Sequence, residues 1–254
     1  MSTASRLSTA HEERTVDTKL TDDGYVICEQ VLSAATVERF RKLVDNIRRA
    51  DNVQNVANSS GTYGLRNLTD VMPQASELLR EPKLVSLVQS VLGADAFMTR
   101  ATLFDKTPGA NWGVFWHQDL SIAVQQKHDV PGFNAWTRKA GIDCVQPPLE
   151  LMSRVLAVRL HLDDCHELNG ALRVLPGTHN MRRMDSDEIE QQRESVSEVV
   201  CAAAAGDGLL MKPLLLHASS PMSVEASRRV VHFEFAALDL PHPLEWKYRL
   251  PVGQ

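Results

Sequence analysis

The stretch AFMTRATLFDKTPGANWGVFWHQD, residues 96–119, decides the fold of this chain. It holds two short runs of alternating side chains, Ala96–Lys106 and Trp112–His117, separated by a turn signal at Pro108-Gly109. Such runs predict β-strands. Further candidate strands follow at Leu151–Leu162, Ala171–Leu175, Leu209–Leu216 and Arg229–Ala237. Many short strands with turns between them are typical of a sandwich or a barrel, so we predict a mainly β protein.

The residues before this stretch follow a helical pattern instead. Ser33 caps a predicted helix that runs to about Ala50 and keeps its apolar residues on one face. These apolar residues are Val37, Phe40, Val44 and Ile47. Ala75–Arg80 and Pro82–Leu92 predict two more helices, and a glycine ends the second one. We expect the helices to pack on the outside of the β core.

Four other segments complete the predicted organisation. Leu20–Val31 predicts a turn and then a short strand, and Asp185–Ala203 predicts a helix. Leu120–Pro148 is long and mixed in composition, which is typical of a lid or a binding loop. Met1–Lys19 is rich in Ser, Thr and mixed charges and lacks the apolar core of a secretory signal, so we predict a disordered leader. With no internal repeat, residues 20–254 are expected to form a single domain.

The composition argues against several classes of partner. A net charge of −5, a pI near 6.0 and the lack of a basic stripe argue against nucleic acid and anionic membranes. No apolar run approaches the roughly 18 residues that a membrane-spanning helix needs. The four cysteines contain no CxxC pair, which fits reduced thiols in a cytoplasmic protein. We therefore expect a cytoplasmic protein that acts on a small molecule; the sequence does not determine its oligomeric state.

Two histidines and one aspartate form a candidate metal site. His117 and Asp119 are two residues apart, so on a strand their side chains point to the same face. His217 follows about a hundred residues later, where the apolar run Leu214–Leu216 gives way to a turn. Two imidazoles and one carboxylate suit a non-haem Fe(II) with open coordination positions. They also form catalytic zinc sites, but the sequence lacks a general base in an HExxH motif, so we predict iron.

A candidate anion clamp follows the second histidine. Arg228 lies eleven residues beyond His217, and its guanidinium could bind the free carboxylate of an organic acid held on the metal. The adjacent Arg229 would point to the opposite face of the same strand, where a surface salt bridge is its expected role. Ser219 could add a hydroxyl donor beside Arg228.

Several other residues are candidates for the substrate pocket. Arg66 precedes the predicted barrel and could reach its rim, and Trp116 flanks the metal ligands and would keep the site dry. Arg159 and His161 alternate between apolar neighbours on one strand, and Arg173 is placed similarly. Because an unpaired buried charge is costly, charged residues in such strands are seldom idle. An inward set of these residues would suit an anionic or polar substrate.

At this point the chain resembles the phytanoyl-CoA dioxygenase family of Fe(II)/2-oxoglutarate-dependent oxygenases. The resemblance covers about residues 20–238. Its motifs, in order, are Asp23-Gly24-Tyr25-Val26, Leu103–Gly109 leading into Trp116-His117-Gln118-Asp119, Asn169–His179, and His217–Pro221 with Arg228. The resemblance implies a double-stranded β-helix, a jelly-roll barrel like that of the cupins, with helices packed on one side. Four ordered motifs are specific together, whereas each alone is weak.

The resemblance also implies roles for single residues. His117, Asp119 and His217 would hold the iron, 2-oxoglutarate would chelate it, and Arg228 with Ser219 would bind the far carboxylate. Thr102 and Arg159 would lie along the same pocket, although some family members carry an aromatic residue at the position of Arg159.

The implied activity is oxidation of a small molecule by O2, with release of succinate and CO2. Asp119 favours hydroxylation or another oxidation such as desaturation, because related halogenases lack this carboxylate. Two alternatives stay open: a non-catalytic jelly-roll binding protein, and a zinc-dependent hydrolase on a similar barrel.

Overall fold

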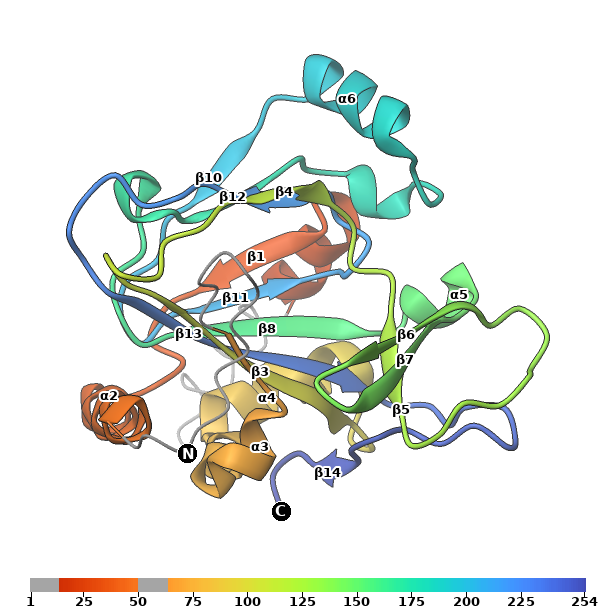
Figure 1. Cartoon of the computed structure of the whole chain (residues 1–254), viewed down its shortest axis with the longest axis horizontal. Coiled ribbons are helices and arrows are strands. Elements are labelled where there is room, and N and C mark those ends of the chain that lie inside the picture. Colours follow the sequence, from red (N-terminus) through yellow and green to blue (C-terminus); the bar gives the residue numbers. More distant parts are fainter. Residues whose placement is uncertain (1–13, 50–63) are drawn as a thin grey trace.

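The computed structural model describes residues 14–49 and 64–254, and two facing β-sheets form its centre (Figure 1). The larger sheet has seven strands in the order β1-β11-β8-β13-β3-β14, with β2 paired to β3 at one side. Its strands are β1 (Tyr25–Cys28), β2 (Gly64–Arg66), β3 (Phe97–Lys106), β8 (Leu156–His161), β11 (Gly208–Met211), β13 (Arg228–Ala236) and β14 (Leu250–Pro251). All of its pairings are antiparallel.

The smaller sheet has four strands in the order β10-β9-β12-β4. They are β4 (Val114–His117), β9 (Leu172–Val174), β10 (Val199–Cys201) and β12 (His217–Ser219). Strands far apart in sequence lie side by side in both sheets, as a jelly roll requires. The predicted jelly-roll fold with flanking helices is confirmed.

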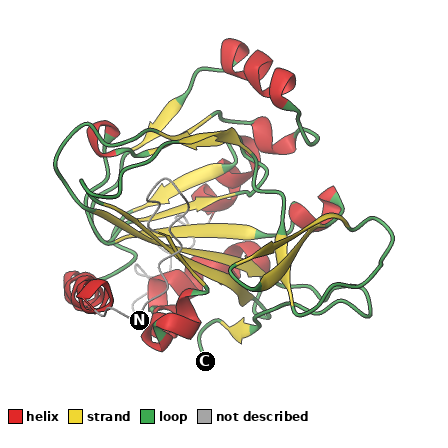
Figure 2. Cartoon of the chain, viewed as in Figure 1, coloured by secondary structure: helices red, strands yellow, loops and turns green. Residues whose placement is uncertain are grey.

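Helices cover one face of the larger sheet (Figure 2). They are α2 (Ala34–Arg49), α3 (Leu68–Val71), the 3-10 helix η1 (Pro73–Arg80) and α4 (Pro82–Leu92). The buried residues of α2, namely Val37, Phe40 and Val44, join the largest hydrophobic cluster, together with alternate residues of the sheet such as Leu103 and Val231. We call this helix-covered side the outer face. The helix predicted from Ser33 is confirmed.

The alternate residues of the same strands form the inner face, which looks toward the smaller sheet. The strand register places Arg66, Thr102, His232 and Arg159 directly opposite one another, in one row across β2, β3, β13 and β8. Residues directly opposite in antiparallel pairs share a face, so this row is a band of polar side chains inside the barrel. The inner face of β8 and β11 is apolar beyond it, because Ala157, Leu209 and Met211 pack against the smaller sheet.

Three predicted elements differ from the structure. The run Leu209–Leu216 is not one strand: β11 ends at Met211, and a turn in which Leu215 N donates to Lys212 O precedes β12, which begins only at His217. In the run Leu151–Leu162, the first residues belong to the short helix α5 (Leu149–Met152), and the strand begins only at Leu156. The predicted helix Asp185–Ala203 is shorter, since α6 (Ser186–Ser195) ends before β10. Apolar periodicity alone does not locate such breaks.

The predicted lid-like loop over residues 120–148 contains a third, three-stranded sheet. Its strands are β5 (Ile122–Val124), β6 (Asn134–Lys139) and β7 (Ile142–Gln146), in the order β5-β7-β6. Ile122, Val124 and Val145 pack in a separate hydrophobic cluster with Phe97 and Trp246. The segment is therefore a structured wall beside the barrel, and the prediction of an irregular loop is wrong.

Residues 14–22 are helical, with Val16 and Leu20 buried at 2% and 1% exposure. The prediction of a disordered leader is therefore wrong for residues 14–19, because this helix has apolar side chains to bury; residues 1–13 lie outside the described residues. In the part of the chain that the structure describes, no helix has the length and apolar character needed to cross a membrane.

Candidate metal centre

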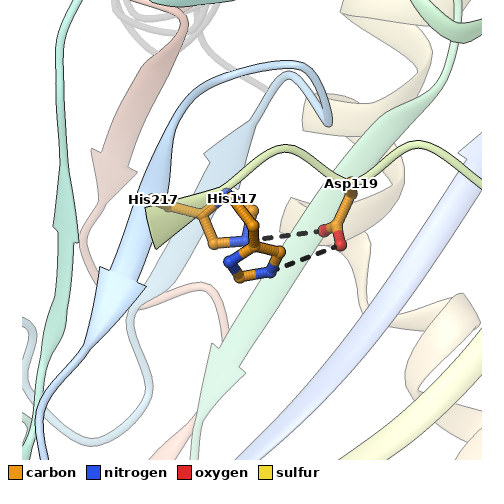
Figure 3. Close-up of side chains that lie close together, drawn as sticks. All are labelled: His117, Asp119 and His217. Carbon is orange, nitrogen blue, oxygen red and sulfur yellow. Dashed lines mark ion pairs between the residues drawn. The ribbon is translucent and has the colours of Figure 1, made fainter. Parts of the chain in front are cut away.

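The structure brings the three predicted metal ligands together at the end of β4 and the start of β12 (Figure 3). One potential ligand atom from each of His117, Asp119 and His217 lies within 4.8 Å of the other two. The Nε2 atoms of His117 and His217 lie 3.8 and 3.6 Å from the two carboxylate oxygens of Asp119. The two strands are paired so that His117 and His217 are direct cross-strand partners, with ring centroids 4.2 Å apart.

Backbone contacts orient these three side chains. The Nδ1 atom of each histidine lies 2.8 Å from the carbonyl oxygen two residues earlier, Phe115 O for His117 and Leu215 O for His217. Donation from Nδ1–H leaves Nε2 as the free ring nitrogen, which is the atom that faces Asp119. The backbone amide of Asp119 donates to Pro213 O at 2.8 Å. The site is therefore held in one arrangement before any ion enters.

The electrostatics of the site favour an ionised Asp119 and a neutral His217. Burial alone would raise the pKa of Asp119, but the neighbouring His217 and His117 lower it to about 2. Burial, and then the nearby His117, lowers the pKa of His217 to about 4. A carboxylate and two neutral imidazoles are the protonation states that metal binding requires.

The donor set fits a divalent transition metal. Two imidazole nitrogens and one carboxylate converge from one side, and this pattern leaves coordination positions for other ligands. Histidine nitrogens and carboxylate oxygens bind such ions at about 2.0–2.2 Å. The observed separations therefore allow one ion to contact all three groups after a small contraction.

A buried cluster of cations lies on the inner face, in the region of Arg228. The side chain of Arg228 is 2% exposed, and its guanidinium donates to Gly170 O. Lys106, which is 1% exposed, donates from Nζ to Ser219 Oγ at 2.8 Å and to Ser220 O at 2.6 Å. Ser219 Oγ in turn donates to Gly170 O at 2.9 Å. No carboxylate among the described residues forms an ion pair with Lys106 or Arg228.

Arg159 and His161 extend this cluster along β8. Burial, and then the positive charge of Arg228, lowers the pKa of Arg159 to about 10. Burial, and then the positive charges of Arg228 and Arg159, lowers the pKa of Lys106 to about 7. Burial, then Arg159 and Arg228, lowers the pKa of His161 to about 3. The Nε atoms of Arg159 and Arg228 and both ring nitrogens of His161 are buried without a hydrogen-bond partner. Because unsatisfied buried donors are costly, this pocket suits an anion.

The predicted cosubstrate and substrate residues separate into two groups. Ser219 belongs to the cation cluster, and Thr102 shares the inner row with Arg159 and Arg66. Trp116 and Arg173 do not face the metal ligands.

The sheet pairing explains this second group. Arg173 lies opposite Ala218, on the face away from His217, and there its guanidinium lies 5.4 Å from the ring centroid of Trp116 and pairs with Glu198 at 3.0 Å. The structure thus corrects the expectation that Trp116 and Arg173 line the pocket, because side chains alternate across a strand.

Four inner-face residues were missed by the sequence reasoning: Lys106, Arg100, His232 and Glu234. Each lies at an even spacing from a predicted residue on its own strand, with Lys106 and Arg100 flanking Thr102 on β3, and His232 and Glu234 following Arg228 on β13. This two-residue spacing along a strand was the available signal that they share a face with the predicted residues. It could not be used alone, because the sequence does not show which face of each strand is inward.

Comparisons with known proteins agree with this fold and identify a family. The family model for phytanoyl-CoA dioxygenase (PhyH) matches residues 20–230. An ectoine dioxygenase of Nocardia farcinica is 24% identical over 185 residues, covering 69% of this chain and 55% of that protein. An L-proline trans-4-hydroxylase of Streptomyces griseoviridis is 25% identical over 162 residues, covering 62% of this chain and 52% of that protein. The chain thus spans about half the length of these curated relatives.

Solved structures show the same fold. The crystal structure of EctD from S. alaskensis with 2-oxoglutarate and 5-hydroxyectoine superposes with a TM-score of 0.69 at 18% identity, covering 88% of this chain and 75% of that one. The carbocyclase SnoK from nogalamycin biosynthesis, described as non-haem and α-ketoglutarate-dependent, gives a TM-score of 0.69 at 15% identity, covering 89% and 84%. With the family model matching most of its length, this chain belongs to the phytanoyl-CoA dioxygenase family.

Proposed function

We propose that this chain is an Fe(II)- and 2-oxoglutarate-dependent dioxygenase that oxidises a small molecule, by hydroxylation, and releases succinate and CO2. One observation carries the proposal: a His-Asp-His triad and a buried cation cluster with unsatisfied donors lie within the same barrel. A metal site alone would fit many functions. A metal site together with an anion pocket fits an organic acid that binds the metal at one end and the cations at the other.

The triad residues would hold the iron through Nε2 of His117, Nε2 of His217 and the carboxylate of Asp119. The ionised Asp119 balances part of the ion's charge, and the backbone contacts at Nδ1 keep both rings in a binding orientation. Bound Fe(II) and 2-oxoglutarate would supply the oxidising chemistry, while the chain supplies orientation and a cavity that excludes water.

The cation cluster would bind the far carboxylate of 2-oxoglutarate. Arg228 and Lys106 would donate to the two carboxylate oxygens, and Ser219 stands beside both donors. Arg159 couples electrostatically both to Arg228 of this pocket and to His217 and Asp119 of the triad, which supports a position along the cosubstrate. Thr102 lies in the same row on β3.

Hydroxylation is the outcome that we propose among the possible oxidations. Asp119 occupies the carboxylate position of the triad, so the site is of the oxygenase type and not of the halogenase type. The curated relatives named above are a dioxygenase and a hydroxylase. Neighbours in fold include an enzyme described as a carbocyclase and one described as an epimerase, so the barrel itself does not dictate the outcome.

We also propose a location and an extent for the working unit. The four cysteines, Cys28, Cys144, Cys165 and Cys201, are all buried, and the described residues contain no disulfide, which supports action in the reducing cytoplasm. Residues 20–254 would act as one domain.

The direct test is succinate release from 2-oxoglutarate with added Fe(II), first without and then with candidate substrates. We expect turnover in the wild type, its loss in His117→Ala, and no change in Arg173→Gln, which removes a charge on the other face of the same sheet. Retained turnover in His117→Ala, or activity only with Zn(II), would contradict the proposal and favour a hydrolase. Binding of ligand without any turnover would favour a non-catalytic binding protein. Circular dichroism of each variant controls for folding.

A further inference from the structure

The inner face carries a second polar cluster at the opposite end of β3 from Lys106. It consists of Arg66, Arg100, His232 and Glu234, which we call the distal cluster. Arg100 and Lys106 are six residues apart on one strand, or about 20 Å at roughly 3.3 Å per residue. A molecule as short as 2-oxoglutarate that is anchored by Lys106 and Arg228 and chelates the metal cannot also reach Arg100. Arg100, at the far end of the distal cluster, is therefore free for another ligand.

The distal cluster faces the metal ligands and not the helices. Leu65 is buried in the hydrophobic cluster beneath the helices, so its neighbour Arg66 on β2 points to the inner face. His232 and Arg100 both act electrostatically on Asp119, and Asp119 acts in turn on Arg66 and Arg100. The distal cluster and the triad thus border one space.

The β6–β7 hairpin closes this space on one side. Arg100 Nη2 lies 3.7 Å from Cys144 Sγ on β7, and the side chain of Asn67, next to Arg66, donates to Ala140 O at 3.1 Å. Arg66 itself is exposed at the rim.

The charges of the distal cluster leave one cation in excess. Glu234 is committed to Arg100, with Oε1 at 2.9 Å from Arg100 Nη1, and it also lies 3.8 Å from His232 Nε2. No carboxylate among the described residues lies within ion-pair distance of Arg66. Partial desolvation by its neighbours, and then the like charge of Arg100, lowers the pKa of Arg66 although its side chain reaches solvent, so an anion placed between the two guanidinium groups would relieve their repulsion.

We propose that the substrate is a small carboxylate-bearing molecule, that Arg66 binds its carboxylate at the rim with Arg100 as the second donor, and that this contact presents the substrate to the metal. The proposal rests on the proposed function. A guanidinium binds a carboxylate through two parallel hydrogen bonds, so the contact fixes the direction of the substrate as well as its position. Arg100 keeps its guanidinium partly available, because among the described residues its hydrogen-bond partner besides Glu234 is the weak thiol acceptor of Cys144.

The test uses a panel of small carboxylic acids, each paired with its primary amide, and includes L-proline with L-prolinamide. Binding is measured as the shift in melting temperature of the metal-loaded protein with 2-oxoglutarate under anaerobic conditions, and turnover as succinate release in air. We expect the binding compounds to be acids, with at least a tenfold weaker Kd for the matching amide. Arg66→Gln should weaken the binding of those acids at least tenfold, Arg66→Lys should weaken it less, and Arg173→Gln should leave it unchanged.

Several outcomes would overturn the proposal. The first is that amides or amines bind with the same affinity as the acids, and the second is that no acid binds. The third is that the Arg66→Gln variant binds the acids with the affinity of the wild type. The affinity for 2-oxoglutarate, measured by calorimetry, separates this failure from that of the proposed function. A wild type that binds no Fe(II) or 2-oxoglutarate contradicts the proposed function, whereas intact binding of both with no preference for acids contradicts only the role of Arg66. The role of the buried Arg100 is tested with Arg100→Lys, which keeps a charge beside Glu234, and the affinity for the acids is measured as for Arg66→Gln.

Discussion

Raising the pH from 6 to 8 is expected to weaken the binding of 2-oxoglutarate about tenfold, through Lys106. Burial, and then the positive charges of Arg228 and Arg159, lower the pKa of Lys106 to about 7 in the protein without cosubstrate. An incoming carboxylate favours the charged ammonium and so raises this pKa. Binding therefore takes up a proton whenever Lys106 is neutral beforehand. Affinity is full at pH values below the lower pKa and falls as the pH rises above it.

The magnitude follows from the fraction of protonated Lys106. With a pKa of about 7, about ten elevenths of the molecules carry the proton at pH 6 and about one eleventh at pH 8. The ratio is about ten, which corresponds to about 1.4 kcal/mol of binding free energy. The other titratable groups of the pocket do not change charge in this range, because His161 has a pKa of about 3 and Arg159 of about 10. Cys165, the remaining neighbour, acts in the opposite sense and only weakly.

Calorimetry measures this effect directly on the metal-loaded protein without oxygen. Titrations with 2-oxoglutarate at pH 6, 7 and 8, in two buffers of different ionisation enthalpy, give the affinity and the number of protons taken up. We expect about 0.9 proton per bound molecule at pH 8 and about 0.1 at pH 6. Lys106→Met should bind more weakly at every pH, with no proton uptake. An affinity that stays constant from pH 6 to 8 in the wild type, or a slope that survives in Lys106→Met, would refute the reasoning.

Four further changes test the fold and the site. Arg228→Met removes a buried charged donor and should weaken 2-oxoglutarate binding about 100-fold, or about 2.7 kcal/mol, by calorimetry; an effect below threefold would contradict its role. Gly170→Ala should weaken the same binding, because its φ is +75° and an added Cβ would lie 2.5 Å from Ser220 O and 3.0 Å from Lys106 Nζ; unchanged binding would speak against a rigid pocket. Phe40→Ala removes a fully buried side chain between α2 and the sheet and should cost about 3–5 kcal/mol in urea unfolding, with a loss below 1 kcal/mol excluding a packed interface there. Arg173→Gln should leave succinate release within twofold, and a large loss would place Arg173 in the site after all.

The sequence predicted the metal centre well because its geometry is local. His117 and Asp119 are two residues apart, and that spacing puts both on one side of an extended chain whatever the rest of the fold. Linking them to His217 needed the ordered family motifs, since the pairing of β4 with β12 is a contact across about a hundred residues. The strand β3 and the helices α2 and α4 were predictable for the same reason, as each has a strong periodic pattern of its own.

The pocket was predicted less well because it depends on register. Arg173 sits between apolar residues just as Arg159 does, but Arg159 faces the barrel interior, whereas Arg173 faces away from it. Lys106 is the last residue of a strand, where the sequence alone would suggest a solvent-exposed lysine. Its neighbours across the sheets bury it, so that only 1% of it is exposed. Segment 120–148 resembles a loop in sequence because its strands β5 and β7 are short and β6 is mostly exposed, so no long alternating pattern marks its sheet.

The two faces of the large sheet have a consequence for how this protein can change. Along β13, Val231, Phe233 and Phe235 belong to the helix-side cluster, while Arg228, His232 and Glu234 belong to the interior. Substitutions at neighbouring positions are therefore expected to act on different properties, one set on the folding free energy and the other on the interior pocket. A library that varies only the interior positions of β2, β3 and β13 leaves the main cohesive cluster untouched. Such a strand can acquire new substrate preferences one residue at a time while the scaffold keeps its stability.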